Sequence, residues 1–149
     1  MSLQVMATTT HWFGLALYGT ILTTFALAAT ARSRNRTQVL AAYQKWGAIL
    51  GLSMGAIIFG GIGIHLLEYG LHWPPETDPD QHAILAKYGV FAVLWFSSFH
   101  LEIWTLEPLR QLPSGKENRP ACARRATRQL QANAVLFHLV GLITLLHLR

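Results

Sequence analysis

The sequence predicts an all-α integral membrane protein, a four-helix up-down bundle that crosses the bilayer. The first observation is composition: of 149 residues, 52% are hydrophobic and 13% charged, whereas a soluble domain has about 25% charged residues. The second is that the apolar residues gather in four long runs. A helix rises ~1.5 Å per residue, so each run can cross a ~30 Å hydrocarbon core. We therefore expect a single transmembrane domain over residues 1–149.

The four apolar runs give the expected helices in order. They cover about residues 11–31, 43–70, 82–106 and 130–148, and the last two carry more polar residues than the first two. Helices satisfy their own backbone hydrogen bonds, as lipid requires. Short connections favour antiparallel neighbours, so the predicted bundle alternates in direction.

The basic residues predict an orientation. Ten of the twelve Lys and Arg residues lie in or beside the first and third loops, and only Lys87 and Arg149 lie elsewhere. The positive-inside rule places both loops in the cytoplasm. Both termini and the acidic loop 71–82 then face outward, and we expect a multi-pass protein of a bacterial-type inner membrane. The ten residues are Arg32, Arg34, Arg36, Lys45, Arg110, Lys116, Arg119, Arg124, Arg125 and Arg128.

Several function classes find no support in the sequence. The net charge of +5 comes from loop residues that form no binding patch, so we expect no nucleic-acid partner. A single cysteine, Cys122, excludes an internal disulfide and a cysteine-based metal cluster. Ser97 and Ser98 lack a plausible catalytic-triad partner, and we find no phosphate-binding loop. No Lys or Arg precedes the first run, so no cleavable signal peptide is expected. Catalytic residues are therefore unknown, and redox activity is the enzyme class left open.

Two of the seven histidines interrupt apolar runs. If Leu109 and Gln129 mark the cytoplasmic ends of the third and fourth runs, His100 and His138 each lie nine residues inside. Both would then be about 13 Å from that boundary, near mid-membrane. Two imidazoles at one depth on neighbouring helices can ligate one haem iron as axial ligands. Hydrogen bonds between helices explain them equally well.

A second group of histidines lies near the predicted outer face. His11 begins the first run and His65 lies near the end of the second, so they form a second predicted pair of haem iron ligands. Alternatively, this group binds copper or zinc together with Glu68, because imidazole suits both metals. One haem near each face would provide an electron path across the bilayer. Three further histidines are better explained as interfacial residues: His72, His82 and His147.

Glycines and two charged residues in the runs have two interpretations each. Gly47, Gly51 and Gly55 recur at spacing four on one helix face, which favours helix packing over clearance for a flat macrocycle. Glu102 either hydrogen-bonds to the fourth helix or carries protons. Lys87 either extends toward the interface or pairs with a haem propionate.

Four stretches carry a family resemblance: "HWFGLALYG", "KWGAILGLSMGAIIFGGIGIHLL", "ILAKYGVFAVLWFSSFHLEI" and "ARRATRQLQANAVL". They resemble the CopD/HemJ-like membrane proteins over most of the chain. That group includes haem-binding proteins linked to protoporphyrinogen oxidation and others linked to copper uptake. The resemblance implies functional roles for His11 and Lys87. The layout also resembles four-helix dihaem b-type cytochromes, which use paired histidines from facing helices.

The leading hypothesis is a membrane protein that binds one or two b-type haems and transfers electrons. We expect His100 with His138, and His11 with His65, as axial ligands. Lipid, other membrane or redox subunits, and quinone at one edge are the expected partners. One alternative is a non-catalytic subunit of a respiratory or photosynthetic assembly, whose histidines hydrogen-bond or ligate chlorophyll. The other is copper uptake, which is disfavoured because only Met1, Met6 and Met54 offer thioether ligands.

Overall fold

The structure is a computed structural model that describes residues 2–31, 35–70, 81–111 and 119–147. The side chains of Ala83 and residues 145–147 lie outside this description. Within these ranges every element is a helix, which confirms the predicted all-α class. The elements are α1 (Leu3–Ala31), α2 (Arg36–Lys45), α3 (Gly47–Tyr69), α4 (Gln81–His100), the π-helix η2 (Leu101–Leu106), α5 (Glu107–Gln111) and α6 (Arg119–His147).

Three helical segments in the described residues are long and apolar enough to cross a membrane: Leu3–Ala31, Gly47–Tyr69 and Ile84–Gln111. Their outer faces carry large apolar side chains, with Leu52, Phe59 and Trp104 each at least 70% exposed. Such faces suit lipid and are costly in water. The predicted fourth span falls within α6, which is not one of these three segments, so it remains a prediction.

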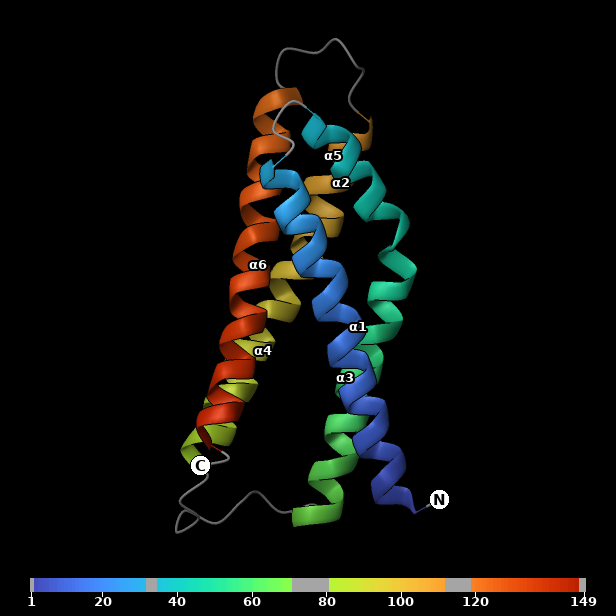
Figure 1. The fold of residues 1–149 in the computed structure, drawn as a ribbon, viewed down its shortest axis with the longest axis vertical. Helices are drawn as coiled ribbons and strands as arrows, with labels where there is room; N and C mark the ends of the chain where they lie inside the picture. Colours follow the sequence, from blue (N-terminus) through green and yellow to red (C-terminus); the bar gives the residue numbers. More distant parts are fainter. Residues whose placement is uncertain (1, 32–34, 71–80, 112–118, 148–149) are drawn as a thin grey trace.

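Helices α1, α3, α4 and α6 run along the long axis of the molecule (Figure 1). They form two packed pairs, α1 with α3 and α4 with α6, and α1 also packs against α6. The start of α1 and the end of α6 lie at one end, whereas α2, α5 and the start of α6 lie at the other (Figure 1). The described parts of the two basic segments therefore share one end of the molecule.

Two helices begin earlier than their apolar runs suggest. α1 begins at Leu3, before the run that starts at His11, and α6 begins at Arg119, well before residue 130. Pro120 is tolerated there because the first helical turn needs no N–H from it. Ala and Arg, which favour helix, then continue the turn. An apolar run therefore predicts the part of a helix that suits lipid, and each of these two helices begins before that part.

The third run contains a wide helical turn before Pro108. Proline has no N–H, and its ring crowds the carbonyl group four residues earlier, here that of Trp104. The preceding turn is a π-helix, in which the Glu107 N–H donates to the carbonyl oxygen of Glu102, five residues back. Glu102 is the second residue of this π-helix.

Glycines bring α1 and α3 close together. A Cβ atom at Gly60 would lie 2.6 Å from the backbone nitrogen of His11, and one at Gly14 would lie 2.7 Å from the carbonyl oxygen of Ser53. Both positions therefore require glycine for this separation. By contrast, a Cβ at Gly47, Gly51 or Gly55 meets no atom of the described chain within 4 Å. Within the described part of this chain, no other helix therefore packs closely on that glycine face in the way that the spacing had predicted.

Candidate functional site

A cavity of about 800 Å³ lies in the half of the molecule where α1 begins. This volume is within the range of sites that bind small molecules and cofactors. Four helices contribute to the wall, and most of the side chains are apolar. The lining comprises His11, Trp12, Leu15 and Ala16 of α1; Ile57, Ile58, Gly61, Ile62, His65 and Leu66 of α3; Lys87, Tyr88 and Phe91 of α4; and Phe137, Val140, Gly141 and Thr144 of α6.

The cavity lies where the two helix pairs diverge. Toward the middle of the molecule, Gly19 of α1 lies against the ring of Phe137 of α6. The Tyr18 hydroxyl is 2.7 Å from the Ser98 hydroxyl of α4, and the Tyr18 ring packs on Phe137 at 5.8 Å between centroids. Beyond this layer the pairs separate toward the end that holds the start of α1 (Figure 1). Phe137, which lines the cavity and packs on Tyr18, therefore marks its inner end.

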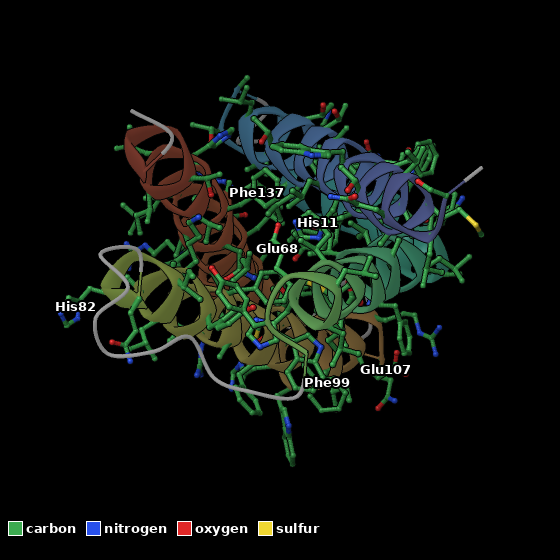
Figure 2. The ribbon with its side chains drawn as sticks, turned by 90° about the horizontal axis from the view of Figure 1, so that it is seen from below. His11, Glu68, His82, Phe99, Glu107 and Phe137 are labelled. Atoms are coloured by element: carbon green, nitrogen blue, oxygen red, sulfur yellow. The ribbon has the colours of Figure 1, made fainter. Side chains whose placement is uncertain are left out.

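His11 is held by its contact with α3. Its Nδ1 atom is 2.8 Å from the carbonyl oxygen of Ile57. A carbonyl oxygen only accepts, so Nδ1 donates this hydrogen bond, and Nε2 is the ring nitrogen that is left to bind a ligand. Histidines that bind metals commonly donate their other N–H to a backbone carbonyl in this way. Figure 2 shows His11 between the helices, so its position and tautomer suit a ligand to a metal centre in the cavity.

His65 lies in the same cavity as His11. Its Nδ1 atom is 3.3 Å from the Tyr88 hydroxyl, which connects α3 with α4. The His65 ring also packs near the Tyr69 ring, with centroids 5.3 Å apart. Lys87 lines the cavity beside Tyr88. The structure therefore brings the two residues of the predicted outer pair to one site, and their role as iron ligands stays a prediction.

Within the described residues, the outer side chains proposed to bind copper or zinc do not gather into a cluster. In the described ranges no three or more His, Cys, Asp or Glu side chains are placed to hold one metal ion. His82 is exposed and points away from the helices (Figure 2). His72 lies outside the described residues, as does the side chain of His147. A donor set for a bare metal ion is therefore not seen in the part of the chain that is described.

His100 and His138 do not lie at one depth. Gln129 donates from Nε2 to His100 Nδ1 at 3.0 Å, so these two residues lie at about the same height along the helix axes. His138 is nine residues further along α6, about 13 Å away by helix rise. The premise of equal depth is therefore wrong, because α6 begins at Arg119 and shifts the register between the third and fourth runs. His138 instead lies against α1, with its Nε2 atom 3.0 Å from Thr23 Oγ1.

Polar side chains near mid-molecule connect α4 with α6. Asn133 of α6 is fully buried, accepts a hydrogen bond from Ser97 and donates to Ser98 at 3.2 Å. Gln129 also donates to the Ser97 carbonyl oxygen at 3.0 Å. Such bonds satisfy polar groups and hold helices in register within lipid. His100 is part of this network through its hydrogen bond from Gln129, which explains it as a residue that helps to hold α4 against α6.

No protein-family model matches this sequence, and neither a curated protein nor a solved structure matches it. The resemblance to CopD/HemJ-like proteins and to dihaem b-type cytochromes therefore stays a prediction.

Proposed function

We propose that this chain is an integral membrane protein that binds b-type haem in the cavity between the two helix pairs and takes part in electron transfer. One observation carries the proposal: a mostly apolar cavity of about 800 Å³ is lined by both His11 and His65. A b-type haem needs axial nitrogen ligands and an apolar slot. We propose that His11 and His65 would hold the haem iron, with quinone or a larger redox complex as the exchange partner.

The residues present fit that group. The Ile57 carbonyl fixes the His11 tautomer that leaves Nε2 able to bind iron. Lys87 supplies a cation in the wall for a propionate. Haem would supply a one-electron couple, while the chain orients it, excludes water and holds its charge. His100 and His138 are the less favoured pair because their register separates them, so we propose one haem.

A second function, that of a packing subunit in a larger assembly, is favoured by the glycine face of α3. A Cβ atom added at Gly47, Gly51 or Gly55 would meet no atom of the described chain within 4 Å, so this face of α3 is open. Small residues at such spacing let another transmembrane helix approach closely. The two functions are compatible, and a Gly51→Leu variant that co-purifies with the same partners as the natural chain would contradict this one.

We further propose a transmembrane four-helix bundle with α2, α5 and the start of α6 in the cytoplasm. Cys122, near the start of α6, is half-buried and is the only cysteine of the chain. We expect a thiol reagent that cannot cross membranes to label Cys122 in inverted inner-membrane vesicles and not in intact spheroplasts. Labelling only in spheroplasts would contradict this orientation, and a Cys122→Ala variant gives the background.

Filling the cavity tests the proposed function. Gly141 lines the cavity, and a Cβ there meets no described atom within 4 Å. We expect Gly141→Phe to lose most of its haem and to keep its helix content, because the new ring occupies the slot and displaces no packed atom. Haem and protein are quantified after purification in detergent.

Gly89 of α4 provides the matched control for this experiment. It is also exposed with open space around its Cβ, and it does not line the cavity. Gly89→Phe should therefore retain natural haem content. Full haem content in Gly141→Phe would show that haem does not occupy this cavity.

A further inference from the structure

Glu102 is a carboxyl group that the proposed haem site does not use. It lies in the π-helix η2, inside the segment Ile84–Gln111 that is long and apolar enough to span a membrane. Its Oε1 atom is buried and finds no hydrogen-bond partner among the residues that the structure describes. A carboxylate left so is costly in an apolar medium, and ionisable groups within spans are commonly functional. Wide π turns also occur frequently at functional sites.

Among the described residues, no titratable group around Glu102 forms an ion pair with it. Tyr43 of α2 and Tyr18 of α1, both buried, interact electrostatically with its carboxyl group. On α4, His100 is bonded to Gln129. On α5, Glu107 and Arg110 pair with each other at 2.8 Å. The remaining charged groups on the packed helices are Arg36, whose Nε is buried without a partner in the described chain, Lys45, Lys87, Arg119, Arg124, Arg125 and Arg128.

The surroundings of Glu102 differ on its two sides. Toward the cavity, Ser98 lies one turn earlier on α4 and is bonded to Tyr18, and the fully buried Leu94 follows. Toward the other end, α5 follows η2 directly, and its residues Arg110 and Gln111 are exposed. Glu102 itself is partly exposed. The buried Leu106 and Leu109 separate Glu102 from those exposed residues, so its own partial exposure is its access to the surroundings.

We propose that Glu102 is a proton-binding site within the membrane, which exchanges its proton through its partly exposed side. Protonation converts the carboxylate and one proton into a neutral carboxylic acid, and release reverses this without another reactant. The neutral acid removes the cost of an unpaired charge in lipid, and the ionised form remains accessible through the partly exposed side. The inference stands without haem, so it survives a failure of the proposed haem site.

Infrared titration of the full-length protein in detergent tests this site. We expect a carbonyl-stretch band of a protonated carboxyl group that shifts in heavy water and disappears as the pH is raised. The band should be absent from Glu102→Gln and present in Glu107→Gln, a control five residues away in an exposed ion pair. Identical titrations of the natural chain and Glu102→Gln would overturn the proposal. A Glu102 signal that responds to sodium and not to pH would also overturn it.

A conservative variant keeps the test decisive if Glu102→Gln fails to fold. Glu102→Asp retains the carboxyl group in a shorter side chain. We expect its band to titrate at a different pH from that of the natural chain, because the group moves relative to Tyr18 and Tyr43. A titration unchanged from the natural chain would assign the band to another carboxyl group and overturn the proposal.

Discussion

The His11→Ala variant should purify almost free of haem. The change removes the imidazole whose Nδ1 is anchored on the Ile57 carbonyl oxygen and whose Nε2 we propose as iron ligand. Loss of an outer-shell partner alone weakens metal affinity about 10–100-fold, so loss of the ligand itself should cost at least as much. Haem per chain, measured as its pyridine complex, and the Soret absorbance of the purified protein report the result.

Two further histidine variants serve as controls for His11→Ala. His82 is exposed and points away from the helices (Figure 2), so His82→Ala should keep the natural haem content. His138 contacts Thr23 and does not line the cavity, and His138→Ala should keep it too. If His138→Ala lost its haem and His11→Ala retained it, the result would favour His100 and His138 as the iron ligands and contradict the proposed site.

The Gly60→Ala variant should be less stable and should bind haem weakly. Its new Cβ would lie 2.6 Å from the His11 backbone nitrogen and 2.8 Å from the His11 Cα. Both are main-chain atoms, so α1 and α3 must move apart. Overpacking of this kind costs about 1–3 kcal/mol, and the displacement of His11 should also lower haem content. Thermal unfolding in detergent, followed by circular dichroism, measures the first effect.

Gly51→Ala is the matched control for Gly60→Ala on the same helix. A Cβ at Gly51 meets nothing within 4 Å in the described chain. Alanine is a better helix former than glycine by about 1 kcal/mol, so Gly51→Ala should be neutral or slightly stabilising. Equal melting temperatures for Gly60→Ala and Gly51→Ala would mean that α1 and α3 are not packed as closely as the structure has them.

The sequence was sufficient to predict the helical class and the approximate place of the apolar segments. It was insufficient for helix ends, because an apolar run reports lipid contact and not helix length. α6 shows this most clearly: its first turns, from Arg119 onward, are polar and helical. That difference changed the register between the third and fourth runs, and with it the expected depth of His138 relative to His100.

The candidate site was predictable only in part. His11 and His65 were grouped because the start of the first run and the end of the second both lie near the predicted outer face, and the two residues do line one cavity. The cavity itself depends on how each helix is rotated and on where the helix pairs diverge, which periodicity in mostly apolar runs does not determine. The close approach of α1 and α3 depends on Gly14 and Gly60, whereas the more regular glycine face at Gly47, Gly51 and Gly55 meets no described atom.

The most direct test of the haem proposal is a dithionite-reduced minus oxidised visible spectrum of the purified full-length protein, with haem counted per chain. We predict a sharp α band and one haem per chain, as expected for iron held by His11 and His65 in the cavity. A protein that stays colourless after haem supplementation during expression would contradict the proposed function, and the glycine face of α3 would then become the first feature to explain.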